Sequence, residues 1–343
     1  MSRSEITIDL GALRRNAAAL VDAAGGAELW GVVKADAYGH GAVDCARAAL
    51  EGGARALCVA TAKEGAALRA ELADARILVL SPLAEAEEHA AREAGLEVAV
   101  STPRLPEGLP VHVKVDTGMG RFGMSPAEAT QIDPGRVAGV MSHLATADED
   151  DAAFVGAQLD AFAAVVERFP GAIRHVANSA ATLSIPEARL DAVRCGVALY
   201  GLSPFGRDPE EHGLEPVLSW RSYVAQAKVL RRGDSTGYGR RFVAKGETRI
   251  GLVPVGYGDG FRRDLTGTEI RVAGEPRRVV GTVSMDSFAV ELDRELPVGA
   301  PIVIIGQGVL AEAHARVAGT INYELTCGIE TDPLRARRTV VDG

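Results

Sequence analysis

The stretch LWGVVKADAYGHG, residues 29–41, begins as a buried strand and ends in a run of polar and small residues. Trp30, Val32 and Val33 are side chains of the kind that a strand packs inside a protein core. Lys34 follows them directly, before any loop has begun. An ammonium group at the end of a buried strand is costly unless it has a counter-charge or a chemical task. This lysine is therefore the first candidate for a functional residue.

The bulk composition limits the classes of protein that come into question. The chain has 343 residues, of which 47% are hydrophobic and 24% charged, an ordinary balance for one large or two ordinary globular domains. Its net charge of −9 argues against nucleic acid or an acidic membrane as a partner. No apolar run reaches the ~18 residues of a membrane span, and the first residues do not resemble a signal peptide. We therefore expect a cytoplasmic protein whose four cysteines are reduced thiols.

Short apolar runs alternate with helix-like segments over residues 1–214. After a first strand, EITIDL, there are eight such runs: WGVVKA, ALCVAT, RILVLS, LEVAVS, VHVKVD, VAGVMSHLA, IRHVANS and AVRCGVAL. Most gaps between them hold Ala-, Glu- and Arg-rich segments with helical spacing, such as KEGAALRAELADA. Strands that alternate with helices imply parallel βα units. Eight units predict a closed (β/α)8 barrel of the TIM type; the alternative is an open, doubly wound sheet.

The pattern changes near residue 215. From there to residue 343, strand-like runs follow one another with glycine turns between them, which predicts a mostly antiparallel β domain. AEAHARVAG is the one segment that looks helical. The first strand, about residues 4–10, can pack with this domain instead of the barrel. IIGQGVLAEA has the outline of a dinucleotide-binding fingerprint, but too few residues follow it to complete such a fold.

Basic residues gather at the predicted ends of the barrel strands, where barrels carry their active sites. The residues concerned are Lys34, Lys114, Arg121 and Arg194, together with His143 and His175. Cations that converge in a partly buried site are costly unless an anion neutralises them, so we expect a small anionic ligand. Each residue also has an ordinary structural interpretation; Arg194, for example, could pair with a carboxylate that the sequence does not locate. The acidic run at 148–151 is interpreted as a solvated helix start, and we expect no metal.

Two segments occupy the usual position of a phosphate site in such barrels. They are ANSAAT and RCGVALYG, after the seventh and eighth predicted strands. A desolvated lysine beside other cations has a lowered pKa and is a nucleophile toward carbonyl groups. Together these features point to pyridoxal 5'-phosphate, which binds through a lysine Schiff base, a phosphate site and a protein group that faces its ring nitrogen.

The segment VVKADAYGHG resembles the cofactor-lysine motif of alanine racemases, and further motifs of that family follow in order over almost the whole chain. They are VKVDTGMGRFG, SHLATADE, HVANSAAT, VRCGVALYG, GYGRRF, PVGYGDG, GTVSMD and INYEL. The resemblance implies a pyridoxal-phosphate-dependent isomerase that interconverts L- and D-alanine and provides D-alanine for bacterial cell-wall precursors. It also implies a homodimer whose active sites lie between the subunits.

The resemblance assigns roles to residues of the barrel. Lys34 resembles the Schiff-base lysine, Arg194 the arginine that faces the pyridine nitrogen, and His175 its neighbour. Arg121 matches the residue that contacts the phenolic oxygen of the cofactor and the substrate carboxylate. Lys114 has a supporting role, and members of the family with a lysine there often carry it as a carbamate. The phosphate contacts are matched by Tyr38, Ser179, Gly196 and Val197.

Residues of the β domain complete this expected site. Tyr238 matches the second catalytic base, which the partner subunit supplies. His143, a cofactor-binding residue of the barrel, matches the hydrogen-bonded neighbour of that base. Met285 matches a backbone contact to the substrate carboxylate, with Asp286 beside it, and Tyr257 matches a residue that lines the entrance.

The chain departs from the family near its C-terminus. There CGIETDPLRARR places Thr331 at the position of a phosphate-binding tyrosine. A threonine hydroxyl has a shorter reach, so cofactor affinity and channel width are in question, whereas the chemistry is not. Three alternatives stay open: a racemase of another or a broader set of amino acids, a decarboxylase of the same barrel type, and a non-catalytic pyridoxal-phosphate carrier. Decarboxylases usually pair the ring nitrogen with a carboxylate, and carriers lack the β domain.

A two-base mechanism follows from the stereochemistry. Inverting a carbon centre without moving the substrate requires acid–base groups on opposite sides, which Lys34 and Tyr238 would supply. Arg194 does not donate its proton at accessible pH, so it leaves the ring nitrogen unprotonated. This limits the flow of electrons into the ring and disfavours transamination.

Overall fold

The computed structural model describes residues 2–149 and 151–343. The chain divides into two compact units, and we name each by its architecture. The barrel unit contains Leu13–Phe205 and Pro209–Glu215. The β unit contains the N-terminal residues up to Ala12, Gly206–Asp208 and Pro216–Gly343.

The barrel unit is built on eight parallel strands. They are β2 (Glu28–Val32), β3 (Ala56–Val59), β4 (Ile77–Val79), β5 (Glu97–Val100), β6 (Val111–Lys114), β7 (Val137–Met141), β8 (Ile173–His175) and β9 (Ala192–Cys195). Their order in the sheet is β8-β7-β6-β5-β4-β3-β2-β9. The end strands are joined as well, because the Asp191 N–H donates to the Arg174 carbonyl at 3.1 Å and the Arg194 N–H to the Ala177 carbonyl at 2.9 Å. The sheet is closed, and the predicted (β/α)8 barrel is confirmed.

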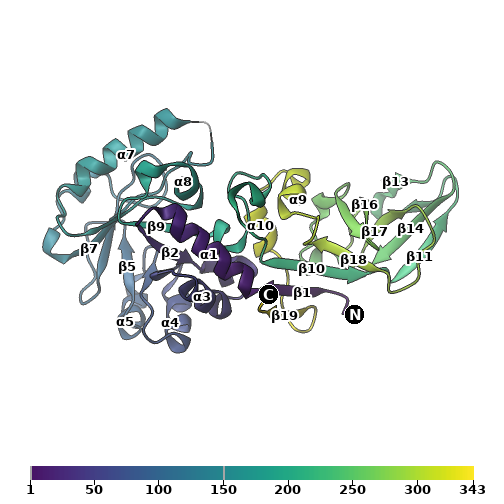
Figure 1. The fold of residues 1–343 in the computed structure, drawn as a ribbon, viewed down its shortest axis with the longest axis horizontal. Coiled ribbons are helices and arrows are strands. Elements are labelled where there is room, and N and C mark those ends of the chain that lie inside the picture. Colours follow the sequence, from purple (N-terminus) through teal and green to yellow (C-terminus); the bar gives the residue numbers. More distant parts are fainter. Residues whose placement is uncertain (1, 150) are drawn as a thin grey trace. The chain divides into compact units, whose positions relative to one another are not determined.

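Helices follow most of these strands, and several of them lie on the outside of the barrel unit (Figure 1). They are α1 (Leu10–Ala24), α2 (Lys34–Gly39), α3 (Ala42–Glu51), α4 (Ala62–Glu71), α5 (Glu88–Glu93), α6 (Pro126–Ala129), α7 (Ala152–Val166) and α8 (Ser179–Ser184). Local signals set their starts. α4 begins with a capping box between Thr61 and Glu64. α7 begins after Asp151, whose carboxylate accepts the Phe154 N–H at 3.1 Å, as predicted for the acidic run; Asp150 lies outside the described residues.

One side of the barrel interior is apolar. One buried cluster consists of Trp30, Val32, Ala56, Cys58, Leu78 and Ala192, from β2, β3, β4 and β9. Val32 and Ala192 thus lie on the inward face, as the parity of their strands predicts. Burial raises the pKa of the Cys58 thiol to about 12, so this residue is a neutral packing group of the core.

The β unit is one nine-stranded sheet and a separate hairpin. The strands are β1 (Glu5–Asp9), β10 (Leu218–Tyr223), β11 (Gln226–Leu230), β12 (Ser235–Thr236), β13 (Phe242–Val243), β14 (Thr248–Val253), β15 (Glu269–Val272), β16 (Glu275–Val280), β17 (Phe288–Leu292), β18 (Pro301–Ile305) and β19 (Arg337–Val341). The sheet order is β11-β14-β17-β16-β15-β18-β10-β1-β19, and β12 pairs with β13. β1 pairs antiparallel with β10 and parallel with β19, so the N-terminal strand belongs to this sheet.

Two helices accompany the β unit. α9 (Ala311–Ala318) is the segment that the sequence pattern predicted, and α10 (Asn322–Cys327) was not predicted. Six residues are too few to show a helical repeat, which explains the omission. Within the described part of the chain, no helix has the length and apolar character needed to span a lipid bilayer.

Candidate active site

Lys34 begins an unusual turn at the end of β2. The four residues after it, Ala35 to Tyr38, all have positive φ angles, between 51° and 56°. A left-handed conformation costs a residue other than glycine about 1–2 kcal/mol, so the surrounding structure must hold this turn. Glu64 is one such support, because its carboxylate accepts the N–H groups of Ala35 at 2.8 Å and Ala60 at 2.7 Å. The turn brings Tyr38 back beside the ends of neighbouring strands.

Tyr38 meets a small polar cradle at the carboxyl ends of β8 and β9. The Ser179 hydroxyl, at the first residue of α8, accepts the N–H groups of Gly196 at 3.1 Å and Ala198 at 3.3 Å. A Cβ atom on Gly196 would lie 2.3 Å from the Tyr38 hydroxyl oxygen, so only glycine leaves space there. Two hydroxyl groups and a bare backbone turn that continues into Val197 thus converge, the arrangement that sequence analysis predicted for a phosphate.

The predicted cations surround His143. Burial and, after it, the charges of Arg194, Arg121, Lys114 and Lys34 together lower the pKa of His143 to about 3. The same charges act on Lys114. Burial is the largest cause, followed by the charges of Arg194, Arg121 and Lys34, and together they lower the pKa of Lys114 to about 8. Sequence analysis placed these side chains at the ends of different strands, and the structure brings them together. Their shared positive field suits an anionic ligand.

Arg194 is buried and held from several sides. Its Nη1 donates to the His175 carbonyl at 2.7 Å and to His175 Nδ1 at 2.8 Å. Its Nη2 donates to the Ser142 carbonyl at 2.8 Å and contacts His143 Nδ1 at 3.4 Å. Among the described residues, its Nε atom has no hydrogen-bond partner. Burial lowers the pKa of Arg194 to about 10, which still leaves it charged at neutral pH.

One loop of the β unit gathers the residues expected from that unit. The Thr282 hydroxyl donates to the Tyr238 carbonyl at 2.8 Å, and the Tyr257 N–H donates to the Ser284 carbonyl at 3.1 Å. The Gly258 N–H then donates to the Met285 carbonyl at 2.9 Å. Tyr238, Tyr257 and Met285 are therefore fixed along residues 282–285, between β16 and β17, and all three have exposed side chains.

Asp286 belongs to an ion-pair cluster next to this loop. Its carboxylate lies 2.8 Å from Arg335 Nη2, and Arg335 also pairs with the buried Asp259 at 3.0 Å. Asp259 in turn accepts the Gly256 N–H at 2.9 Å and pairs with Arg3 at 3.0 Å. The Glu330 N–H donates to the Asp259 carbonyl, which fixes the backbone just before Thr331. The cluster thus holds the backbone on both sides of Tyr257.

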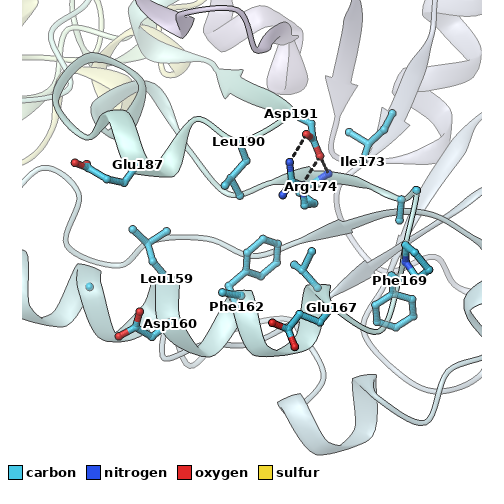
Figure 2. A pocket seen from close by; sticks show the side chains of 16 residues that line it. Leu159, Asp160, Phe162, Glu167, Phe169, Ile173, Arg174, Glu187, Leu190 and Asp191 are labelled. Atoms are coloured by element: carbon cyan, nitrogen blue, oxygen red, sulfur yellow. Dashed lines mark hydrogen bonds and ion pairs between the residues drawn. The ribbon is translucent and has the colours of Figure 1, made fainter.

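A large groove lies elsewhere on the barrel unit. Figure 2 shows it between α7 and the segments that lead into β8 and β9. The volume of the groove is about 1020 Å³. Leu159, Phe162 and Leu190 line it, and Arg174 pairs across its wall with Asp191 at 2.6 Å. Ile173 and Asp191 stand at the amino ends of parallel strands, whereas Lys34 follows a carboxyl end. None of the residues predicted for the active site lines this groove.

Family models match both units of the chain. The model of the alanine racemase N-terminal domain matches residues 8–204, and the model of the alanine racemase C-terminal domain matches residues 217–338. The chain belongs to the alanine racemase family. It is 40% identical to the alanine racemase of Streptomyces coelicolor over 367 aligned positions, which cover 95% of this chain and 94% of that protein.

Solved structures of alanine racemases have the same fold. The enzyme from D-cycloserine-producing Streptomyces lavendulae is 37% identical and superposes with a TM-score of 0.94, covering 100% of this chain and 98% of that one. The alanine racemase of Bartonella henselae, solved with covalently bound pyridoxal phosphate, is 26% identical with a TM-score of 0.90, covering 98% of this chain and 99% of that one. The predicted family is confirmed.

The sequence pattern did not find two parts of this site. It gave no task to His112 or to Glu97. The structure joins both residues to His175 and Arg194 through hydrogen bonds. The shared parity of His112 and Lys114 was the available signal, since a buried histidine on the inward face of a barrel strand needs a polar partner.

Proposed function

We propose that this chain is an isomerase that interconverts L-alanine and D-alanine with pyridoxal 5'-phosphate as its cofactor. One observation carries the proposal: Lys34, the Ser179–Gly196 cradle and the Arg194 guanidinium converge at the carboxyl end of one barrel. Membership of the alanine racemase family points to the same chemistry. A cytoplasmic location and a supply of D-alanine for cell-wall precursors are part of this proposal.

The residues present fit the cofactor. A phosphate is an anion with several acceptor oxygens, and the cradle offers the hydroxyls of Tyr38 and Ser179 next to the backbone of Gly196 and Val197. The absence of a Cβ atom at Gly196 keeps that cradle open. Arg194 presents only donors, which suits a ring nitrogen that acts as an acceptor. When bound, pyridoxal phosphate draws electron density from the α-carbon of the amino acid and so acidifies its proton.

The chain's own residues then move that proton. Lys34 is the base on one face, and Tyr238 is the base on the other. Arg121 holds the substrate carboxylate by charge-assisted hydrogen bonds, and the backbone at Met285 adds a neutral contact. His143 stays neutral, as its low pKa requires. Because its Nδ1 atom faces the Arg194 guanidinium, its ring proton lies on Nε2 and can be donated to the oxygen of Tyr238. Because Arg194 keeps its proton, it leaves the ring nitrogen unprotonated and favours return of the proton to the same carbon.

We further propose that the active site is completed by a second copy of the chain. Tyr238, Tyr257 and Met285 are exposed on the β unit, although all three have large side chains with apolar surface and all are expected at the site. A homodimer that covers these side chains with the partner's barrel would give each site one base from each subunit. Tyr257 would then line the entrance and Asp286 would support the adjoining loop.

The decisive experiment is a direct assay. Purified protein is loaded with pyridoxal phosphate and mixed with L-alanine, and D-alanine is followed by chiral chromatography beside a panel of other L-amino acids. We expect the two enantiomers of alanine to reach equal concentrations. Faster turnover of serine or a basic amino acid would identify a different racemase, release of carbon dioxide would identify a decarboxylase, and bound cofactor without turnover would identify a carrier.

A further inference from the structure

A chain of hydrogen-bonded side chains crosses the interior of the barrel and ends at Arg194. Arg194 Nη1 lies 2.8 Å from His175 Nδ1, and His175 Nε2 lies 2.8 Å from His112 Nδ1. His112 Nε2 lies 2.7 Å from Glu97 Oε2. Both imidazoles are completely buried. Glu97 is the first residue of β5, so the chain runs from the amino ends of the strands to the site at their carboxyl ends.

The two ends of this chain fix the positions of its protons. A guanidinium has donors only, so His175 Nδ1 must accept from Arg194 and the ring proton of His175 must sit on Nε2. That proton is donated to His112 Nδ1, which leaves the His112 proton on Nε2. An ionised carboxylate has acceptors only, so Glu97 takes this last hydrogen bond. Arg194 and Glu97 therefore require the same donor-to-acceptor direction for the hydrogen bonds between them.

Other protonation states break a buried bond. A proton on His175 Nδ1 would face a donor of Arg194, and a proton on His112 Nδ1 would face the Nε2 proton of His175. A doubly protonated ring at either position has the same defect. Burial lowers the pKa of both histidines, His175 well below its ordinary value, which agrees with two neutral rings. A buried N–H without an acceptor keeps its full cost of desolvation, so the states are well separated.

The surroundings hold this geometry. Arg76 donates two hydrogen bonds to the Glu97 carboxylate, at 2.7 Å and 2.8 Å. The guanidinium of Arg76 also lies 4.7 Å from the centroid of the Trp30 ring. Burial alone would raise the pKa of Glu97, but the bonds from His112 and Arg76 outweigh it and lower the pKa to about 2. Gly139 leaves room for His112, because a Cβ atom there would lie 2.2 Å from His112 Nδ1. The carboxylate is thus ionised throughout the neutral range.

We propose that Glu97 is a remote positioning residue for Arg194, acting through His112 and His175. The carboxylate locks both rings as neutral Nε2–H tautomers, and the locked His175 presents its bare Nδ1 atom to the guanidinium. This fixes Nη1, and with the Ser142 carbonyl on Nη2 it leaves the Nε donor for a ligand in the barrel mouth. No ion pair between Glu97 and Arg194 is needed, because the two histidines transmit the effect of the carboxylate. The link to the ring nitrogen rests on the proposed function.

The histidine tautomers test this proposal without any enzyme assay. Nitrogen-15 NMR of histidine-labelled protein, free of cofactor, distinguishes the two neutral tautomers and the charged ring, with signals assigned by single replacements. We expect neutral Nε2–H rings at His112 and His175 from about pH 6 to pH 8, where an ordinary histidine titrates. Glu97→Leu removes the final acceptor, so the Nε2–H state then leaves a buried donor unpaired as the other states do, and at least one of the two rings should show a mixture of tautomers. Glu97→Gln keeps a carbonyl acceptor and should preserve both.

Kinetics supply the second readout. Glu97→Leu should lower kcat by up to about 100-fold, since a guanidinium misplaced by about 1 Å costs that much, with a smaller change in the KM for alanine. Glu97→Gln should restore most of the rate. Glu85→Leu, at a glutamate with a side chain that is 87% exposed, is the matched control and should behave as the parent.

The outcomes separate the two proposals. A charged or Nδ1–H ring in the parent, a tautomer change in Glu97→Gln, or unchanged rings in Glu97→Leu would overturn the role of Glu97, whatever the activity. The parent and Glu97→Gln spectra decide the question even where Glu97→Leu fails to fold. A parent with the expected tautomers and no racemisation of alanine would instead refute the proposed function.

Discussion

The two units present their parts of the candidate site in opposite ways. In the barrel unit, Arg194 and Lys114 are only 4% and 7% exposed and lie among other charged groups. In the β unit, Tyr238 is 72% exposed and Met285 is 53% exposed. Arg194 is held by hydrogen bonds from its side chain to the barrel core, whereas the β-unit residues are held through their backbone, with their side chains exposed. Substitutions in the barrel should therefore affect both folding and activity, and substitutions of the exposed residues should affect activity alone.

The largest effect is expected at Lys34, which we assign to the covalent bond with the cofactor. Lys34→Ala should lower activity by more than about 10⁴-fold, the scale seen when a covalent catalyst is removed. Borohydride reduction of the loaded parent should label one peptide, the one that contains Lys34. Lys63→Ala, at an exposed lysine of α4, is the control and should keep its yellow colour. A label on Lys63, Lys114 or Lys228 would rule out the assignment.

Tyr238 tests the exposed side of the comparison. Tyr238→Phe should lower activity by about 10²–10⁴-fold, the share of a general acid–base group, while the free energy of unfolding stays within about 0.5 kcal/mol of the parent. Mixing the inactive Lys34→Ala and Tyr238→Phe proteins should restore activity, because one site of each mixed dimer then holds both bases. If subunits exchange and activity does not return, both bases act within one chain and the proposed shared site is wrong.

Arg194 tests the buried side. Arg194→Glu would place a carboxylate against the carbonyls of Ser142 and His175, so we expect a loss of about 3–5 kcal/mol in the free energy of unfolding. It would also offer the ring nitrogen a protonating partner, so racemisation should slow by about 100-fold and pyridoxamine phosphate should accumulate. Arg194→Lys, which keeps a charged donor, should show little of that side product. An unchanged ratio of products in Arg194→Glu would refute the electronic argument.

The comparison also explains what the sequence could and could not predict. All eight barrel strands were predictable, because each is a short apolar run and helical segments separate most of them. The exposed residues Tyr238 and Met285 came from family resemblance, since nothing in local pattern distinguishes them. The left-handed turn from Ala35 to Tyr38 was not predictable, because only tertiary contacts such as those of Glu64 hold four residues other than glycine in that region.

Side-chain hydrogen bonds between strands that are distant in the sequence were not predictable either. The bonds from Arg194 through two histidines to Glu97 join β9, β8, β6 and β5, and no periodicity in one strand specifies its partner in another. Short elements such as α10 lie below the length at which a repeat can be recognised. The basic residues at the strand ends predicted that a polar site exists in the barrel. Only the fold identifies which of its groups are joined by hydrogen bonds.

The smallest and most specific effect is expected at Lys114, where burial and the neighbouring cations act together on the pKa. Burial and the charges of Arg194, Arg121 and Lys34 lower its pKa to about 8, while Asp116 acts the other way. Asp116 is already engaged, because its carboxylate accepts the N–H groups of Gly118 at 3.0 Å and Gly120 at 3.1 Å. A neutral amine can take up carbon dioxide to form a carbamate, and this anion could hold the Arg121 guanidinium toward the substrate carboxylate.

A folded-state pKa near 8 sets the expected dependence on pH for this reaction at Lys114. The neutral amine is scarce below that value and grows as the pH rises through it, so carbamate formation should increase in the same direction. Lys114→Ala should raise the KM for alanine by about 10-fold, equivalent to ~1.4 kcal/mol, and acetate should partly reverse the loss by filling the vacated anion site. Carbon-13 bicarbonate should give a carbamate NMR signal in the parent and none in the variant. A fully active parent without that signal would leave Asp116 or a bound chloride as the counter-charge and end the carbamate proposal.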